Sequence, residues 1–414
     1  MEKRKVWIVS HYSMPPQYET RVKTLKYAQY LSKKGYDVLL FTASTIHNTN
    51  INLMDGSKLY EKKTYDDLNF VHIYCHAYNG NGIKRIMNMQ EFSHKFSKVA
   101  KNFKTPDIIV AADMNCTNYK PIFKFCHKKN IPMIIDIRDF WPESIVEYLH
   151  FSKNNPIIKY LYHEEKEMYK NVDCSIISVE GGIDYIKEKH WDKDIDLNKI
   201  QYINNGVDLK EFKDNTNKYT IDDVLLNSDS FKVIYTGSIR LANDIGSIVN
   251  AAENLKDKNI FFLIYGDGPE KEKFENIVKE KKLNVFFQGQ VKREYIPYVL
   301  SKADLTILNY APSNMFRFGG SQNKFFEYAA AGKPIISNIK MGYDPILKYD
   351  LGKVVEVGNS KSLSDAIEYF YNTENEKKKC ADNCQEFIKL FDYEILCEKL
   401  KKIIDILIEG ERII

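Results

Sequence analysis

The sequence predicts an α/β protein made of two doubly wound, Rossmann-like domains. The chain has 414 residues, which is more than one hydrophobic core of ordinary size organises, so two domains of roughly 150 to 200 residues each are expected. Short apolar runs alternate with helical periodicities along both halves, a pattern typical of parallel sheets with crossover helices. Glycine-rich turns follow several of the apolar runs, where parallel strands would end.

In the first half, an apolar run at residues 6–10 predicts a strand, and residues 21–34 have the spacing of an amphipathic helix that ends at Gly35. The next strand is expected at 37–42. Further apolar runs predict strands at residues 70–74, 108–111, 133–137, 174–179 and 200–203. Helical segments between them favour a mostly parallel sheet.

A second alternation begins after the polar stretch 214–230. Its predicted strands are residues 232–235, 260–265, 285–288, 305–308, 334–337 and 353–357. Its predicted helices include residues 245–254, 270–281 and 295–301. A single helical pattern with an apolar stripe then covers residues 382–408.

These patterns predict an N-terminal domain over residues 1–200, a second domain over 201–390, and a C-terminal helix over 391–414 that packs back toward the first domain. In parallel sheets of this kind, ligands bind beyond the carboxyl ends of the strands. We therefore expect the site in the loops that follow strands, with both sheets facing an interdomain cleft.

Composition excludes several classes of function. The net charge is +4, which is too small to indicate nucleic acid as a partner. No apolar run is long enough to span a membrane, and no signal peptide is evident, so we expect a cytoplasmic protein. The seven cysteines include no CxxC pair, and buried free thiols are the better interpretation than a metal site.

The most informative segment is the loop 319–322 with the helix that follows it. Glycines lead into a helix start, and unpaired amides at a helix start attract phosphate. Lys324 adds a positive charge one turn into the helix, and Glu327 could accept from the hydroxyls of a ribose. This predicts a nucleotide diphosphate site. The alternative is an ordinary loop and helix cap, with Lys324 solvated.

Three other loops follow strands of the second half. The first contains Gly237, Ser238 and Arg240, whose guanidinium suits phosphate. The second contains Gly266, Asp267 and Gly268, and the third spans residues 288–291. A structural turn explains any one of them equally well, but four such loops at one sheet edge favour a binding site.

Several motifs in these segments resemble the GT-B glycosyltransferases, and among them the large retaining family usually numbered four. The matching strings are YTGSIR, IYGDGPEKEKFE, VFFQGQVKREYIPYVLSKADLTIL, NKFFEYAAAGKPIIS and YINNGVDLKEF. The strings DIRDFWPES and YNGNGIKRIMNMQEFS are similar to a subgroup that assembles bacterial surface polysaccharides such as capsule or O-antigen. That subgroup includes transferases of N-acetylated deoxyamino sugars.

This resemblance implies a GT-B fold and retaining sugar transfer from a nucleotide donor, with UDP preferred. It implies that Glu327 binds ribose, that the backbone near Val291 faces the base, and that Arg240 holds the diphosphate. The donor loop it assigns to the diphosphate comprises Gly319, Gly320, Ser321 and Asn323. Asp139, Arg138, Arg240 and Lys324 are the expected catalytic residues.

The chain departs from the family at three places. Gly319 stands where many relatives carry a second glutamate. Ser238 and Asn243 stand where relatives often have a basic pair. Residues 14–20 replace the usual paired glycines after the first strand.

In the N-terminal half, Arg138 and Asp139 follow a buried strand, where relatives often have His-Asp. The functional interpretation places Asp139 on the acceptor hydroxyl, and the structural alternative is a salt-bridged turn. The residues assigned to the acceptor side are His11, Arg21, Tyr78, Asn81, Arg85 and Glu143. A structural or solvated role is the more frequent one for a histidine such as His11.

No divalent metal is expected, because the only Asp-x-Asp run, at residues 192–196, lies in a polar connection away from any strand end. Helix amides, Arg240 and Lys324 would then stabilise the leaving diphosphate. By resemblance, the acceptor is a lipid-linked saccharide at the inner membrane face. A stripe of Phe92, Phe96, Val99 and Phe103 with interleaved lysines is compatible with peripheral membrane contact, although a core-facing helix is favoured.

Two other functions compete with sugar transfer. A nucleotide-sugar 2-epimerase shares the two-domain architecture, but the carboxylates and histidine it needs around the sugar are not apparent. A catalytically silent subunit that binds a nucleotide sugar would fit the missing glutamate at Gly319. Release of sugar from the donor would distinguish an active enzyme from such a subunit.

Overall fold

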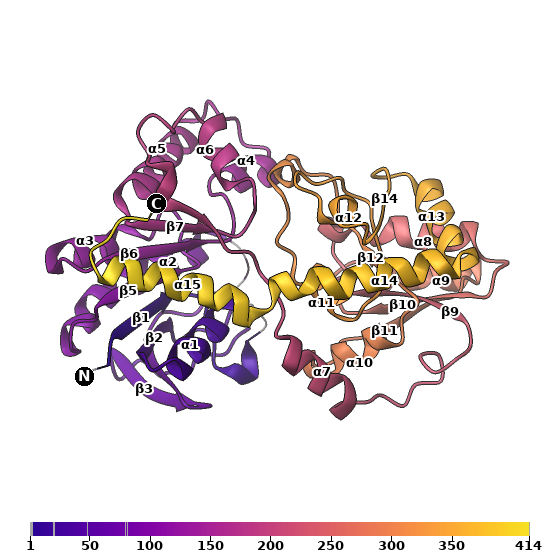
Figure 1. Cartoon of the computed structure of the whole chain (residues 1–414), viewed down its shortest axis with the longest axis horizontal. Helices are drawn as coiled ribbons and strands as arrows, with labels where there is room; N and C mark the ends of the chain where they lie inside the picture. Colours follow the sequence, from indigo (N-terminus) through magenta and orange to yellow (C-terminus); the bar gives the residue numbers. More distant parts are fainter. Residues whose placement is uncertain (1–2, 20, 48, 79, 81, 414) are drawn as a thin grey trace. The chain divides into compact units, whose positions relative to one another are not determined.

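The computed structural model describes residues 3–19, 21–47, 49–78, 80 and 82–413. The chain divides into two compact units, each with its own sheet and helices (Figure 1). Unit 1 comprises residues 1–204 and 394–414, and unit 2 comprises residues 205–393. The predicted fold class of two Rossmann-like domains is therefore confirmed.

Unit 1 contains an eight-stranded sheet with the strand order β3-β4-β2-β1-β5-β6-β7-β8. Its strands are β1 (Lys5–Ser10), β2 (Asp37–Ala43), β3 (Tyr60–Tyr65), β4 (Leu68–Ile73), β5 (Ile108–Ala112), β6 (Met133–Ile137), β7 (Cys174–Ile177) and β8 (Ile200–Tyr202). All neighbours pair in parallel except β3 and β4. Every residue of β5 and β6 is buried, because helices cover both faces of a parallel sheet.

Strand β3 was not predicted, because it lacks an apolar run. Its sequence YEKKTY is polar, and its residues are partly or fully exposed, as suits the edge of a sheet, where lysines discourage pairing with another chain. Asp66 and Asp67 both have positive φ angles, 45° and 64°, which is typical of the tight turns that join antiparallel strands. A hairpin therefore closes this edge.

The helices of unit 1 connect the strands. They are α1 (Lys23–Lys33), α2 (Ile83–Val99), α3 (Lys120–Lys129), α4 (Glu143–Leu149), α5 (Pro156–Asn171) and α6 (Gly182–Glu188). Helix α1 ends just before Gly35, whose φ of +93° favours glycine.

The aromatic stripe of α2 belongs to the core. Phe92, Phe96 and Val99 are fully buried. The ring of Phe96 lies edge-on to those of Trp7 and Phe41, at centroid distances of 6.3 and 5.2 Å. Phe103 is partly buried. The favoured interpretation of a core-facing stripe is therefore confirmed, and these side chains are not available to a membrane.

Unit 2 contains a six-stranded parallel sheet with the order β11-β10-β9-β12-β13-β14. Its strands are β9 (Phe231–Thr236), β10 (Ile260–Tyr265), β11 (Val285–Gly289), β12 (Leu305–Leu308), β13 (Ile335–Ser337) and β14 (Gly352–Val354). Its helices are α7 (Leu209–Lys218), α8 (Ile245–Asn254), α9 (Lys271–Lys281), α10 (Ile296–Ser301), α11 (Asn323–Ala330), α12 (Pro345–Lys348), α13 (Ser360–Asn372) and α14 (Glu374–Ile388).

The predicted helical segment 382–408 consists of two helices, α14 and α15 (Tyr393–Ile408). A 3-10 turn at Lys389–Phe391 and an extended Asp392 separate them. Helix α15 belongs to unit 1, where Arg4 donates to Asp405 at 2.8 Å and Leu400 is fully buried. Among the described residues, no helix combines the length and apolar character that crossing a bilayer requires.

Candidate nucleotide and acceptor sites

The start of α11 lies against the carboxyl end of β9. The hydroxyl of Tyr328, in α11, accepts from the backbone N–H of Thr236, the last residue of β9, at 2.9 Å. Gln322 precedes the helix and makes no side-chain capping bond. The N–H of Phe325 donates to the carbonyl of Gln322 at 3.1 Å, so the amides of Asn323 and Lys324 are the ones that have no cap and are available to an anion.

Lys324 occupies the first turn of this helix. Its Nζ donates to the hydroxyl of Tyr235 at 3.0 Å and lies 4.5 Å and 4.8 Å from the ring centroids of Tyr235 and Tyr310. No carboxylate of the described chain forms an ion pair with it, and burial lowers the pKa of Lys324 to about 7. An ammonium that has aromatic faces but no counter-ion is suited to bind an anion.

The loops after β9 and β10 pack closely against each other through glycines. A Cβ on Gly266 would lie 1.8 Å from the carbonyl oxygen of Gly237, and one on Gly268 would lie 2.2 Å from that of Ile239. The N–H of Ile239 donates to the carbonyl of Asp267 at 2.8 Å. Gly266 and Gly268 are thus explained by packing between loops, whereas the side chain of Asp267 is exposed.

The loop after β9 differs from its expected phosphate-binding form. Asn243 donates to Ser238 Oγ at 2.8 Å and to the Ser238 carbonyl at 2.8 Å. Ser238 and Asn243 are thus hydrogen-bonded to each other, at the positions where relatives often have a basic pair. Arg240 is exposed and forms no ion pair with any residue that the structure describes. Its guanidinium is therefore the accessible cation of this loop.

Gly319 is buried and has a φ of +102°, a conformation that residues with a Cβ rarely adopt. A glutamate or any other residue with a Cβ would be strained at this position. The next residues are also tightly placed: a Cβ on Gly320 would lie 2.5 Å from Met341 Sδ. The carbonyl of Ser321 accepts from Asn205 Nδ2 at 2.6 Å. The buried Oγ of Ser321 has no partner among the described residues.

Glu327 lies one turn beyond Asn323, the first residue of α11, and its side chain is 19% exposed. Its Oε1 is 3.9 Å from Nε of Arg293, and burial raises the pKa of its carboxyl. Val291, in the same loop as Arg293, is partly buried against the core of unit 2. Arg293 was not singled out from the sequence, although its loop was.

In unit 1, a buried ion pair joins the carboxyl ends of three strands. Lys23 Nζ donates to Asp136 Oδ1 at 2.9 Å, to Ser178 Oγ at 3.0 Å and to the carbonyl of Ile203 at 2.8 Å. Lys23 and Asp136 are 1% and 0% exposed. The sequence carried a signal for this pair, because Lys23 lies on the apolar side of a predicted amphipathic helix.

Arg138 and Asp139 have different surroundings. Arg138 Nε lies 2.9 Å from Asp113 Oδ1, and its Nη2 donates to Thr24 at 2.7 Å. Ser10 donates to the other oxygen of Asp113 at 2.8 Å. The salt-bridged alternative therefore describes Arg138, whereas the neighbouring Asp139 is exposed and available to a ligand.

An aromatic and cationic cluster follows β1. The guanidinium groups of Arg21 and Arg85 each lie 5.1 Å from the ring centroid of Tyr12, and Arg85 Nε donates to the Tyr12 hydroxyl at 2.6 Å. His11 is 2% exposed and hydrogen-bonded to Asn88, and burial lowers its pKa to about 4. His11 is therefore a neutral core residue, and the arginines are the accessible members.

Another predicted acceptor residue, Tyr78, is buried. The Tyr78 hydroxyl and His47 Nδ1 are hydrogen-bonded at 2.7 Å, and burial raises the pKa of Tyr78 to about 12. Asn81 lies outside the described residues.

Glu143 is a correction to the sequence interpretation, because its carboxylate is used inside the protein. Lys153 donates to it at 3.0 Å, and Lys189 and Tyr162 also donate to it. Burial alone would raise its pKa, but these three donors outweigh burial and lower the pKa to about 2. Glu143 anchors the start of α4 and is not exposed to an acceptor.

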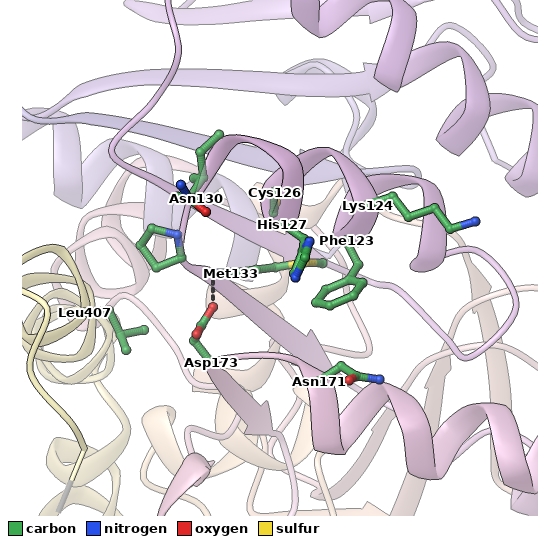
Figure 2. A pocket seen from close by; sticks show the side chains of 11 residues that line it. Phe123, Lys124, Cys126, His127, Asn130, Met133, Asn171, Asp173 and Leu407 are labelled. Atoms are coloured by element: carbon green, nitrogen blue, oxygen red, sulfur yellow. Dashed lines mark hydrogen bonds between the residues drawn. The ribbon is translucent and has the colours of Figure 1, made fainter.

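A cavity of about 620 Å³ lies at the opposite, amino end of the unit 1 sheet. Figure 2 shows Leu407 on one side of it and Phe123 and His127 of α3 on another. Asp173 already accepts from the N–H of Met133 at 2.8 Å. No predicted site residue lines this cavity. In the described part of the chain, no group of three or more His, Cys, Asp or Glu is placed to hold a metal.

Most of unit 2 matches a known protein family. Residues 218–387 match the family described as glycosyl transferases group 1. A 2-deoxystreptamine N-acetyl-D-glucosaminyltransferase from Niallia circulans is 34% identical over 109 residues, which cover 25% of this chain and 26% of that protein. The sequence match thus spans about a quarter of that relative.

Solved structures of similar fold cover almost the whole chain. Sucrose-phosphate synthase from Thermosynechococcus elongatus has a TM-score of 0.74 at 16% identity, covering 99% of this chain and 100% of its own. Anabaena Alr3699/HepE in complex with UDP and glucose has a TM-score of 0.66 at 13% identity, covering 97% and 99%. The lipopolysaccharide outer core galactosyltransferase WaaB has a TM-score of 0.60 at 15% identity, covering 97% and 99%. At these identities the likeness shows a shared fold.

Proposed function

We propose that this chain, which has the GT-B fold and whose residues 218–387 belong to the glycosyl transferases group 1, transfers a sugar from a nucleotide diphosphate donor to a saccharide acceptor. Unit 2 would hold the donor, and the carboxyl edge of the unit 1 sheet would supply acceptor contacts. Transfer would retain the anomeric configuration.

The observation that carries this proposal is the start of α11. Uncapped amides, the half-buried Lys324 and the glycine turn at Gly237 come together at the end of β9. Charge develops on the leaving diphosphate as the bond to the anomeric carbon breaks, so cations and amides fixed in place lower the barrier. Lys324 and Arg240 would supply the positive charge in the proposed mechanism, with no requirement for a divalent metal.

The finer assignments rest on the sequence motifs and on likeness in fold to solved structures. A UDP donor is supported by the UDP complex of the structural neighbour from Anabaena, and a role in surface polysaccharide assembly by the likeness to the lipopolysaccharide galactosyltransferase. We propose an acceptor that is lipid-linked and located at the cytoplasmic face of the membrane.

Replacing Glu327 by Ala tests the donor site. Loss of hydrogen bonds from a ribose to a charged acceptor should weaken UDP binding by about 1.5–3 kcal/mol, or roughly ten- to a hundredfold. Isothermal titration calorimetry with UDP measures this. Glu272→Ala, at an exposed position in α9, is the matched control. Unchanged UDP affinity in Glu327→Ala would remove the ribose assignment.

Replacing Asp139 by Ala tests the acceptor side. Because Asp139 is exposed at the end of β6, its loss should leave UDP affinity unchanged and lower kcat at saturating donor. Release of UDP from the UDP-sugar that supports turnover is the measurement. If the wild-type protein binds UDP yet releases no sugar from any nucleotide sugar tested, with or without an acceptor, the alternative of a catalytically silent subunit is correct.

A further inference from the structure

The segment between β6 and α4, which carries the exposed Asp139, is held on both sides of that residue. Before it, Arg138 belongs to the ion pair at the end of β5. After it, Phe140 is 4% exposed and its ring stacks on that of Tyr185, with centroids 4.0 Å apart and planes 13° apart. Glu143, the first residue of α4, ends the segment. The position of Asp139 therefore depends on the groups that hold its neighbours.

Helix α6 supplies the contacts to both Phe140 and Glu143. Tyr185 lies in this helix, and Lys189 directly follows its last turn. The ammonium of Lys189 donates to the Glu143 carboxylate and lies 4.2 and 5.3 Å from the ring centroids of Tyr162 and Tyr185. Helices α4, α5 and α6 are neighbours in unit 1 (Figure 1). Lys189 thus contacts the carboxylate that ends the segment and also the ring on which Phe140 stacks.

Helix α6 is itself fixed to the sheet of unit 1. A Cβ on Gly182 would lie 2.8 Å from Ile177 Cδ1, so the start of α6 packs directly on the last residue of β7. The hydroxyl of Tyr185 donates to Glu165 Oε2 at 2.7 Å, and these two residues are 0% and 1% exposed. A buried and fully packed helix is a rigid support for the side chains that leave it.

Lys153 and Lys189 both contact Glu143, but their surroundings differ. The side chain of Lys189 is 13% exposed, whereas that of Lys153 is 55% exposed. Exposed ion pairs contribute little, whereas removal of one partner from a buried pair leaves the other charge uncompensated. Loss of the Lys189 ammonium should therefore release the Glu143 end of the segment, and loss of the Lys153 ammonium should not.

We propose that Lys189 is a positioning residue for sugar transfer. Through Glu143 and Tyr185 it holds residues 138–143 in the conformation that presents the Asp139 carboxylate to the acceptor. This inference rests on the proposed function, since the placement of Asp139 affects turnover only if Asp139 contacts the acceptor. A displacement of about 1 Å in a reacting group lowers a rate by up to about a hundredfold.

Steady-state kinetics of Lys189→Met test the proposal, because methionine keeps the unbranched stem and removes the ammonium. The assay is release of UDP from whichever of UDP-glucose, UDP-galactose and UDP-N-acetylglucosamine the wild type turns over fastest. The kcat should fall about ten- to a hundredfold, and the KM for the donor should stay within about twofold. Lys189→Arg should restore most of the kcat, and Lys153→Met is the matched control with a change below about twofold.

A double-mutant cycle separates positioning from general support of the fold. In the Asp139→Ala background, Lys189→Met should lower kcat by less than about twofold, because the residue through which Lys189 acts is already absent. An equal loss in both backgrounds would overturn the proposal. If Lys189→Met does not fold, Lys189→Gln keeps a neutral donor to Glu143 and carries the same test with a loss of about fivefold.

Hydrogen exchange of residues 136–149 gives a readout that needs no turnover. Exchange there should be faster in Lys189→Met than in the wild type and Lys153→Met. Unchanged exchange would overturn the inference and leave sugar transfer standing. A wild type that releases no UDP from any of the three donors would instead contradict the proposed function, and the exchange comparison would still decide whether Lys189 holds the segment.

Discussion

At the scale of single residues, Lys324 has the most specific chemistry in the described chain. Its ammonium faces two tyrosine rings and one hydroxyl. Glu327 on its own helix is a charged group that acts on it, and Arg293 lies beside that carboxylate. A bound diphosphate would bring negative charge close to the ammonium of Lys324. Binding of an anion and protonation of Lys324 should therefore be coupled.

This coupling gives a pH prediction. Since the pKa of Lys324 without ligand is lowered to about 7, the side chain is mostly neutral at pH 8 to 9 and must take up a proton to pair with the diphosphate. UDP affinity should fall by up to about tenfold per pH unit above pH 7 in the wild type. Calorimetry in buffers of different ionisation enthalpy measures both the affinity and the proton uptake. Lys324→Arg, which stays charged, should bind UDP with little pH dependence in this range. Identical pH profiles in the two proteins would contradict the coupling.

At the scale of elements, the contact between the loops after β9 and β10 controls the shape of the donor site. Gly266→Ala should destabilise unit 2 by about 2 kcal/mol or more, because a Cβ would lie 1.8 Å from the Gly237 carbonyl and φ is +151°. Gly246→Ala in α8 is the control, since the added Cβ would lie 3.5 Å from the nearest ring atoms of Phe274. That substitution should be neutral or stabilise by up to about 1 kcal/mol. Denaturant unfolding of both variants measures the difference; equal stabilities would show that the loops separate without cost.

Most elements could be predicted from sequence where an apolar run is buried on both faces. Strands β6, β10 and β12 and helix α8 have the predicted bounds. Strand β3 could not be predicted because it is polar, and the division between α14 and α15 because the apolar stripe continues through it. Both features are set by tertiary contacts, which local periodicity does not report.

For the site, the sequence predicted positions at strand ends but not side-chain contacts. The structure places Asp139, Lys324 and Glu327 after strands β6 and β12, at the carboxyl edges of the two sheets. Sequence could not show that Glu143 is held by Lys153 and Lys189, because the two contacts span 10 and 46 residues and match no local helical or strand spacing. The roles of the site residues remain predictions.

At the scale of the whole molecule, two units with separate cores are joined by a chain that passes from unit 1 to unit 2 and returns as α15. Helix α15 contributes Leu396, Leu400 and Ile404 to the buried core, and its Asp405 pairs with Arg4 near the amino terminus. The stability of unit 1 should therefore depend on the last residues of the chain, whereas nucleotide binding should stabilise unit 2.

Thermal unfolding should separate these two dependences. Leu400→Ala removes a fully buried side chain and should destabilise unit 1 by about 2–5 kcal/mol. UDP at a hundred times its Kd should stabilise unit 2 by about 2.7 kcal/mol. Calorimetry of the variant with and without UDP should show one transition lowered by the substitution and another raised by the ligand. Hydrogen exchange read out by peptide would assign each transition to its residues. If UDP protected residues 1–204 and left residues 205–393 unchanged, the donor would be held by unit 1, and the assignment of Lys324 and Glu327 to the nucleotide would be wrong.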